Sequence, residues 1–233
     1  MLRKIIFSSV FSLLFFYSGI LTAQENTPKM NLIETTEFYN TDVGNPAVAG
    51  KSVILKEGFD ITAGGADIWG VKDEFHFAYL TKKGDFDIVA RIESLSKPHL
   101  YTKAGLMARE SLTGGSRHIF FQLFPDNSAR NKNNGGFEFQ YRQMKDGEMK
   151  AIYPARFDGT PEFPVTFPNT WIRLKREGNL FTGYTGTDGK TWKEYTSFTL
   201  KLSKKIYLGL AVTSHNKSEA AVAKFRDISF IVK

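Results

Sequence analysis

Residues 75–92 read FHFAYLTKKGDFDIVARI, and this stretch indicates the fold class. Phe75, Phe77 and Tyr79 alternate with other residues up to the turn at 83–85, and the alternation resumes from Phe86 to Ile92. A period of two is typical of strands that cover a core on one face. Glycine in the break supplies the positive φ that a tight turn needs. The stretch therefore predicts two strands joined by a turn.

The same alternation recurs along the rest of the chain. It is clear in residues 119–123, 137–141 and 206–212. Gly, Asn or Asp residues break the pattern at 114–116, 134–136, 177–179 and 188–190. We expect no long helix, and at most one turn over residues 110–114. Many short strands separated by such turns predict an all-β fold, a two-sheet antiparallel β-sandwich of the jelly-roll type.

The N-terminus has the three parts of a secretory signal. Arg3 and Lys4 precede an uncharged stretch, residues 5–23 (IIFSSVFSLLFFYSGILTA), which ends in small residues before Gln24. The alternative is a membrane anchor, because the stretch is just long enough to span a bilayer. Its serines and Gly19 favour cleavage instead. We expect a signal peptide over 1–23, a secreted or periplasmic protein, and no membrane span after cleavage.

The remaining chain has the composition of one domain. Residues 24–36 are a polar lead-in, and residues 37–233 show no composition break and no internal repeat. There is no cysteine, which excludes disulfides, thiolate zinc sites, cysteine nucleophiles and a lipid-bearing cysteine. Arg3 and Lys4 account for two of the +7 charges, which leaves a mildly basic mature chain. The basic residues are scattered, so we expect no nucleic-acid partner. This excess of positive charge weakly favours an acidic glycan as the ligand, but solubility explains the charge better.

Several strings together carry a family resemblance. They are ADIWG at 66–70, DEFHFAY at 73–79, TKAGLMARESL at 102–112, FQYR at 139–142, DGKTW at 188–192 and GLAVTSHN at 209–216. This set resembles the concanavalin A-like lectin/glucanase superfamily, and within it the bacterial domain family of unknown function labelled "regulation of enolase protein 1". The resemblance covers roughly residues 50–232.

The resemblance implies two packed antiparallel sheets, one of them concave, in an exported protein. Such domains are often found in bacteria that degrade polysaccharides, and many are attached to glycan-active enzymes. The resemblance supplies no established activity. Calcium is common in the superfamily, but no Asp-rich loop in this sequence requires it, so we expect no cofactor and no metal.

Because alternate residues of a strand share one face, several polar side chains are predicted to lie on the same faces of their strands. Lys103 and Arg109 share one face of their strand with Gly105 between them, and Glu138, Gln140 and Arg142 share one face of another. If the two strands are neighbours, these side chains form a polar patch on the concave sheet. Forked donors and amides suit sugar hydroxyls and carboxylates. The alternative is a ladder of paired charges that only stabilises the sheet. A glycine between two cations favours a ligand, because it lets something approach the sheet closely.

Two further residues join this patch as candidates. Trp69 follows the Gly64-Gly65 turn, where an indole could stack on a pyranose ring or fill the core instead. His215 ends a strand, where it could contact sugar or anchor a loop. We expect Trp171 in the core and Trp192 at a hairpin. His76 and His118 are minor candidates.

The sequence gives little support for catalysis. A retaining glycosidase on this sandwich needs two carboxylates close together on one strand, and Glu138 has no acidic neighbour of that kind. Arg109, Gln122, Arg142, His118 and Tyr141 are the residue types of a polysaccharide lyase. They do not follow the order of the alginate-lyase motifs. Serine-hydrolase, P-loop and dinucleotide motifs are absent from the sequence.

These observations predict an exported carbohydrate-binding protein that contacts a polysaccharide or oligosaccharide through a polar face of its concave sheet. One alternative is an enzyme, a lyase or an unusual glycoside hydrolase, acting on an acidic or uncommon polysaccharide. Another is an accessory or structural protein of a polysaccharide-utilisation assembly. The predicted ligand-binding residues converge in one groove with Trp69 at its rim: Trp69, Lys103, Arg109, Glu138, Gln140, Arg142 and His215.

Overall fold

The computed structural model describes residues 29–130, 135–153 and 160–232. The predicted signal peptide lies outside these residues. Strands account for 56% of the structure and helix for 2%, which confirms the all-β fold. The helical part is a short 3-10 turn, η1 (Thr35–Glu37). Residues 110–114 form bends and the start of a turn, so the single helical turn that the sequence allowed there does not form.

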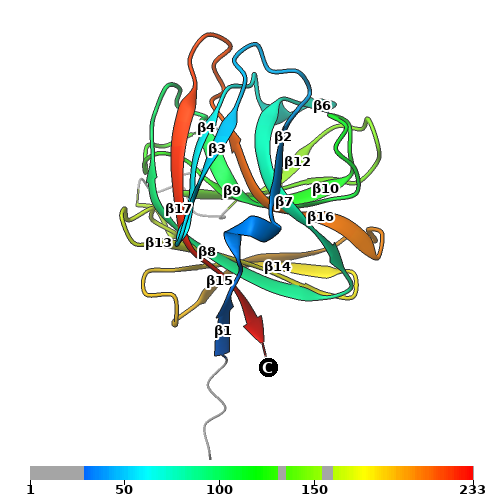
Figure 1. Cartoon of the computed structure of the whole chain (residues 1–233), viewed down its shortest axis with the longest axis vertical. Coiled ribbons are helices and arrows are strands. Elements are labelled where there is room, and N and C mark those ends of the chain that lie inside the picture. The colour runs from blue at the N-terminus through cyan, green and yellow to red at the C-terminus, as the bar shows by residue number, and fades with distance from the viewer. Residues whose placement is uncertain (1–28, 131–134, 154–159, 233) are drawn as a thin grey trace, which may run out of the picture.

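Two antiparallel sheets pack face to face (Figure 1). The larger sheet has the order β15 (Lys193–Thr199), β14 (Leu180–Gly186), β13 (Thr170–Glu177), β8 (Phe86–Leu95), β17 (Ala221–Val232), β4 (Gly58–Ala63) and β3 (Lys51–Leu55), with β1 (Lys29–Leu32) also paired to β17. The seven-stranded sheet has the order β12 (Lys150–Ile152), β11 (Phe137–Arg142), β10 (His118–Leu123), β9 (Lys103–Arg109), β16 (Lys205–Thr213), β7 (Phe75–Lys83) and β2 (Tyr39–Val43). A small hairpin pairs β5 (Ile68–Trp69) with β6 (Lys72–Asp73).

The core lies between the two large sheets. Alternate residues of each strand enter it, as the period of two predicts, and Phe59, Ile88, Leu106, Phe121 and Leu208 are all fully buried there. Each such large side chain contributes about 1.5–3 kcal/mol through the burial of apolar surface. A chain with this core needs no disulfide to fold.

Residues 75–92 do not fold as a hairpin. β7 and β8 belong to different sheets, so the turn at 83–85 crosses the sandwich. The turns at 177–179 and 188–190 do join paired strands. A tight turn leaves the next strand free to pair with either sheet, and local sequence does not decide which.

The aromatic face of β7 points away from the core between the sheets. Ala78 and Leu80 face that core, whereas Phe75 and Phe77 pack on the outer face of the seven-stranded sheet. There they form a second apolar cluster with Ile68 of the β5–β6 hairpin. The hairpin is thereby fixed on the outer face of the sheet.

Part of the predicted lead-in belongs to the sandwich. Residues 29–32 are strand β1, which pairs with the C-terminal half of β17, and the two lie side by side at the bottom of Figure 1. Among the residues that the structure describes, no helix has the length and apolar character to cross a membrane.

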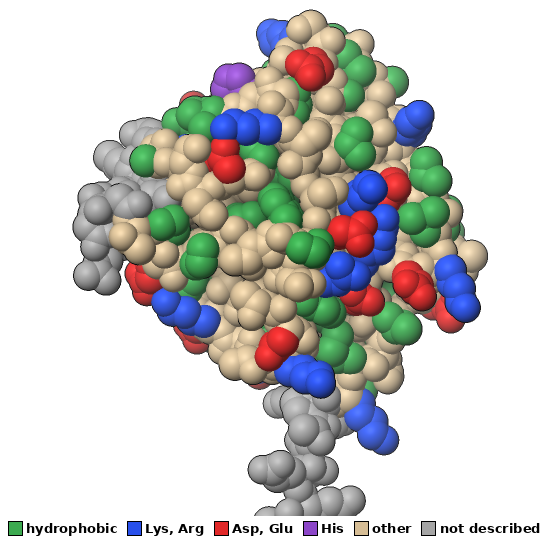
Figure 2. Space-filling model, turned by 90° about the vertical axis from the view of Figure 1, so that its left-hand side faces the viewer, with side chains coloured by type: hydrophobic (Ala, Val, Ile, Leu, Met, Phe, Trp, Pro, Cys, Tyr) green, Lys and Arg blue, Asp and Glu red, His purple; other side chains and the backbone are tan. Residues whose placement is uncertain are grey.

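One face of the molecule carries interspersed charges. In Figure 2, basic and acidic side chains lie next to one another among scattered hydrophobic ones. The larger sheet contributes ion pairs of this kind, such as Arg91–Asp227 at 2.6 Å and Arg226–Asp60 at 2.8 Å. These pairs are partly exposed and contribute little to stability, typically about 0–1 kcal/mol each.

Candidate functional site

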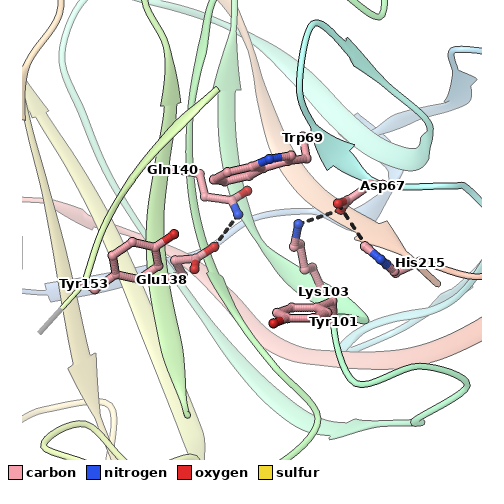
Figure 3. A pocket seen from close by; sticks show the side chains of 8 residues that line it. All are labelled: Asp67, Trp69, Tyr101, Lys103, Glu138, Gln140, Tyr153 and His215. Atoms are coloured by element: carbon pink, nitrogen blue, oxygen red, sulfur yellow. Dashed lines mark hydrogen bonds and ion pairs between the residues drawn. The ribbon is translucent and has the colours of Figure 1, made fainter. Parts of the chain in front are cut away.

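A cavity of about 230 Å³ opens on the outer face of the seven-stranded sheet (Figure 3). Sheet residues supply its floor, and the walls come from the β5–β6 hairpin and from loops next to β9, β12 and β16. We call it the Lys103 pocket. Its lining residues are Asp67, Trp69, Tyr101, Lys103, Glu138, Gln140, Tyr153 and His215.

Register explains why the floor residues meet. The prediction assumed that the strands of Lys103 and Glu138 are neighbours, but β10 lies between them. Glu138 pairs with Gln122 of β10, and Gln122 pairs with Gly105 of β9. All three positions share the outer face of one sheet. The pocket thus contains five of the predicted residues: Trp69, Lys103, Glu138, Gln140 and His215.

The cation of the pocket is already paired. Lys103 is only 3% exposed, and its Nζ lies 2.5 Å from Oδ1 of Asp67. His215 places its Nδ1 3.1 Å from Oδ2 of the same carboxylate. Figure 3 shows Asp67 between these two side chains. Burial would raise the pKa of Asp67, but Lys103 and His215 outweigh it and lower the pKa to about 2. Asp67 is therefore an anion at neutral pH.

Glu138 lies on the opposite side of the floor and is 6% exposed. Its Oε2 accepts hydrogen bonds from the amide nitrogens of Gln140 and Gln122. The carbonyl oxygens of both glutamines are buried and have no hydrogen-bond partner in the described part of the chain. Burial raises the pKa of Glu138, while Lys103 and the Gln140 amide partly oppose that effect.

Aromatic rings form the walls. Trp69 is 39% exposed, and its ring centre lies 5.6 Å from Nζ of Lys103. Tyr101 and Tyr153 line other sides of the pocket, and burial raises the pKa of Tyr153 to about 12, so its hydroxyl keeps its proton at neutral pH. The His215 ring stacks on His99 with 4.3 Å between centres. His215 has a φ of 53°, a left-handed backbone that turns its ring toward Asp67.

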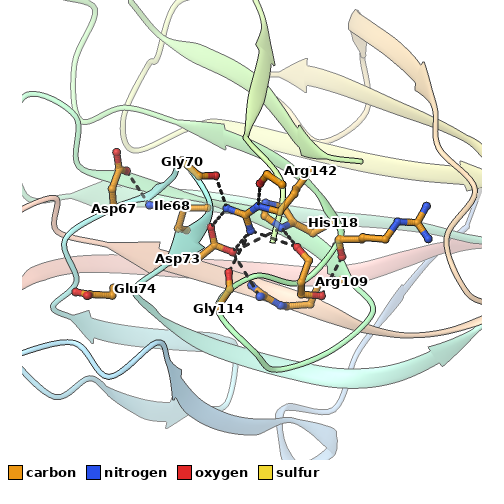
Figure 4. A network of polar contacts seen from close by, with 12 residues as sticks. Asp67, Ile68, Gly70, Asp73, Glu74, Arg109, Gly114, His118 and Arg142 are labelled. Carbon is orange, nitrogen blue, oxygen red and sulfur yellow. Dashed lines mark hydrogen bonds and ion pairs between the residues drawn. The ribbon is translucent and has the colours of Figure 1, made fainter. Parts of the chain in front are cut away.

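Arg109 and Arg142 do not line the pocket, which corrects the predicted convergence of all the polar side chains. Both are fully buried at the other end of the sheet, beneath the β5–β6 hairpin (Figure 4). Arg142 holds both oxygens of Asp73 at 2.7 Å, and Arg109 lies 3.5 Å from the same carboxylate. The two cations do not need a ligand to offset their repulsion, because Asp73 lies between them.

The same two arginines also bind loop carbonyls. Arg142 donates to Gly70 O at 2.9 Å and to Gly147 O at 2.8 Å, and Arg109 donates to Thr113 O at 2.6 Å. Together with Asp73 they form a buried network that fastens the β5–β6 hairpin and two loops to the sheet. This role is structural. It differs from the predicted ladder of paired charges within one sheet, because the central anion, Asp73, belongs to the hairpin.

His118 belongs to this network rather than to the pocket. It is fully buried, with Nδ1 3.0 Å from Ser116 O. Burial, together with the nearby Arg109 and Arg142, lowers its pKa to about 4, with Asp73 opposing them. The imidazole is therefore neutral at physiological pH, and Nδ1 is the protonated nitrogen that can donate to the carbonyl.

Gly105 has a different role from the one expected. A Cβ at this position would lie 2.3 Å from the carbonyl oxygen of Phe121 on the neighbouring strand. The glycine is required by the close approach of β10 and does not leave open space for a ligand. Its position between two cations in the sequence is therefore no sign of a binding surface.

The remaining histidine and tryptophan candidates lie elsewhere. His76 contacts Asp42 at 2.7 Å and Ser52 at 3.1 Å, so it links β7 and β2 of one sheet to β3 of the other. Trp171 is half-buried on the outer face of the larger sheet, 6.5 Å from Trp192 between ring centres. The expectation that Trp171 lies in the core is wrong, because Ile172 and Leu174 occupy the core-facing positions of its strand.

Sequence reasoning missed four residues that matter here. Asp67 and Asp73 stand in the strings that carried the family resemblance. Asp67 directly precedes β5 and Asp73 ends β6, and strands of two residues have no periodicity from which to assign a face. Tyr101 lies in a loop, and Tyr153 directly follows β12. Loop side chains reach the pocket through tertiary structure, so strand parity cannot place them.

Residues 126–136 (DNSARNKNNGG) are a long polar stretch that the sequence predicts to be a loop, and residues 131–134 of it lie outside the described residues. Its first half is held by Arg130, which is buried, donates to Leu100 O at 2.8 Å and pairs with Asp126 at 2.6 Å. Within the described ranges, no group of three or more His, Asp or Glu side chains has the arrangement to hold a metal ion.

Comparison with known proteins identifies the fold. No family model and no curated protein matches the chain. Solved structures do match. A functionally unknown protein from Saccharomyces cerevisiae has a TM-score of 0.60 at 12% identity, over 86% of this chain and 99% of that one. The carbohydrate-binding module CBM66 from Bacillus subtilis has a TM-score of 0.53 at 14% identity, over 84% and 96%.

A mutant of the GH43 protein BlXynB from Bacillus licheniformis has a TM-score of 0.54 at 10% identity, over 76% of this chain and 33% of that one. These matches establish a jelly-roll sandwich of the concanavalin A-like type. At such identities the likeness concerns the fold alone.

Proposed function

We propose that this protein binds carbohydrate outside the cytoplasm and holds one sugar unit in the Lys103 pocket. The observation that carries the proposal is the make-up of that pocket, an aromatic wall beside a polar floor. A pyranose ring has apolar C–H faces and a rim of hydroxyl groups, so it needs both kinds of surface. Trp69 offers the first, and Glu138 and Gln140 offer the second.

The size of the pocket supports a single sugar unit. Its volume of about 230 Å³ is below the roughly 300–1,000 Å³ of sites for drug-sized ligands. The polysaccharide or oligosaccharide would therefore present one ring to the pocket, while the rest of the chain remains on the protein surface.

Two further lines of support come from outside the pocket. One similar structure is a carbohydrate-binding module, and the N-terminal sequence has the pattern of an export signal. The fold alone does not establish function, so the pocket remains the main argument. Membership of the family labelled "regulation of enolase protein 1" stays a proposal that rests on the sequence strings.

A glycan array, followed by affinity electrophoresis in gels that contain plant or algal polysaccharides, tests the proposal. We expect retarded migration in at least one gel and its loss in Trp69→Ala. Tyr39→Ala is the matched control, because Tyr39 is an exposed aromatic residue (69%) on the same sheet and lies outside the pocket. Failure to bind across neutral, amino and acidic glycans would reject carbohydrate binding.

One observation favours an enzyme as the second candidate. Glu138 is a buried carboxyl group with a raised pKa, and Asp67 supplies a second carboxylate in the same pocket. A general acid and a carboxylate anion are the pair that glycoside hydrolysis uses. The pair leaves no sequence motif, because its two residues lie on different elements. Release of reducing ends from bound polysaccharides would support this candidate.

A further inference from the structure

We infer that the Lys103 pocket selects uncharged sugar units and rejects uronates, because its ammonium group is already paired with Asp67 and its floor carries the carboxyl group of Glu138. The inference rests on the proposed function and names the ligand class of the same site. It also opposes the acidic-glycan preference that the basic net charge weakly favoured.

The ammonium group of the Lys103 pocket is not free to pair with a ligand carboxylate. A uronate carboxylate needs a positively charged partner, and Lys103 is the ammonium group among the described residues that line the pocket. Its Nζ already contacts Asp67 at 2.5 Å and also donates to Ile68 O at 3.3 Å. A ligand carboxylate that approached Lys103 would also approach Asp67, and the repulsion between like charges at short range weakens binding.

The amide nitrogens of Gln122 and Gln140 both donate to Glu138, so this carboxyl group is the acceptor at the centre of the floor. The carbonyl oxygen of Gln140 stays buried without a partner in the described part of the chain, and Gln140 lines the pocket. Figure 3 shows this amide between Glu138 and Trp69.

A sugar hydroxyl can donate a hydrogen bond to the carboxyl group of Glu138. A carboxylate can only accept, so a uronate carboxylate in the pocket would lie near Glu138 and Asp67 without an unpaired ammonium group among the described lining residues. The lining groups therefore favour an uncharged ring over a uronate.

Matched sugar pairs test the inference. Glucose with glucuronic acid, galactose with galacturonic acid, and mannose with mannuronic acid differ only at C6, and ligand-observed NMR at neutral pH measures their binding. We expect the neutral member of the bound pair to bind at least about tenfold more tightly. Equal or tighter binding of the uronate overturns the inference and leaves carbohydrate binding intact. Absence of binding to every sugar and polysaccharide overturns the proposed function itself.

A variant tests the physical cause. Glu138→Gln replaces the carboxyl group with an amide that cannot ionise and that adds a donor, so the difference in affinity between the neutral sugar and its uronate should narrow by at least about threefold. Glu194→Gln is the matched control, because Glu194 is exposed on β15, an edge strand of the other sheet. This variant should keep the wild-type difference in affinity. An unchanged difference in folded Glu138→Gln would overturn the role of the floor. The wild-type sugar pairs decide the selectivity even if this variant does not fold.

Discussion

Each carboxylate oxygen of Asp73, in the β5–β6 hairpin, accepts a hydrogen bond of 2.7 Å from one Nη atom of Arg142, and neither side chain has any exposed surface. The pair joins a short hairpin to a strand more than sixty residues away in sequence. Removal of either partner destabilises the folded protein strongly, because the remaining charge would stay buried without a counter-charge.

Arg142→Ala should therefore lower the free energy of unfolding by about 3–5 kcal/mol, the cost of breaking a buried pair. Urea denaturation followed by tryptophan fluorescence measures the change. Lys193→Ala is the control, because the Lys193–Glu162 pair is exposed and contributes about 0–1 kcal/mol. A stable Arg142→Ala protein that had lost only glycan binding would restore the sequence-based interpretation of Arg142 as a ligand contact.

Trp69→Ala should show the opposite pattern. Trp69 is 39% exposed, so its loss should leave the melting temperature nearly unchanged. Truncation of an aromatic anchor in a binding site typically costs about 2 kcal/mol or more, which corresponds to a loss of affinity of about thirtyfold. Titration calorimetry with the best glycan from the array measures it. Unchanged affinity would remove Trp69 from the site.

Gly105→Ala should destabilise the protein by more than about 2 kcal/mol, because its Cβ would collide with the Phe121 carbonyl oxygen at 2.3 Å. Gly178→Ala is a useful comparison. It has open space around it and a φ of 61°, so it should lose only about 1–2 kcal/mol through backbone strain. Thermal denaturation of both variants ranks them. If Gly105→Ala were as stable as the wild type but could not bind glycan, the glycine would after all provide access for a ligand.

Asp67→Asn should destabilise the protein at neutral pH and have little effect near pH 2. The folded-state pKa of Asp67 is lowered from 3.8 to about 2, so the folded protein releases this proton more readily than the unfolded chain does. The resulting stabilisation is present above pH 3.8 and is lost as the pH falls through about 2. It amounts to something on the order of 2 kcal/mol. Denaturation at several pH values gives the profile, and a pH-independent difference would contradict this cause.

Glu138→Gln should have the reverse dependence. The folded-state pKa of Glu138 is raised above 4.5, so protonation favours the folded state. That contribution is fully present below pH 4.5 and is lost as the pH rises through the folded pKa. The variant should therefore gain stability relative to the wild type as the pH rises from about 4 to 8. A constant difference across this range would mean that Glu138 keeps an ordinary pKa.

The sequence predicted the fold well because each strand carries its own period of two and each break carries turn residues. It could not assign β7 and β8 to different sheets, since that choice depends on distant pairing. Within the site, parity placed Lys103, Glu138 and Gln140 on one face. The same parity placed Arg109 and Arg142 there too, but only the tertiary structure shows that the hairpin and two loops cover that end of the sheet. Asp73, which neutralises both arginines, had no periodic signal.

The β5–β6 hairpin has a consequence for how this protein can evolve. The chain segment between β4 and β7 carries both Trp69 of the pocket and Asp73 of the buried network. Asp67 and Trp69 lie on the pocket side, whereas Asp73 meets the arginines beneath the hairpin (Figures 3 and 4). Under the proposed function, substitutions at position 69 would change sugar recognition while Asp73 keeps the hairpin attached to the sheet. Binding specificity would then change through substitutions in the first half of this segment, whereas selection for folding would retain Asp73 in its second half.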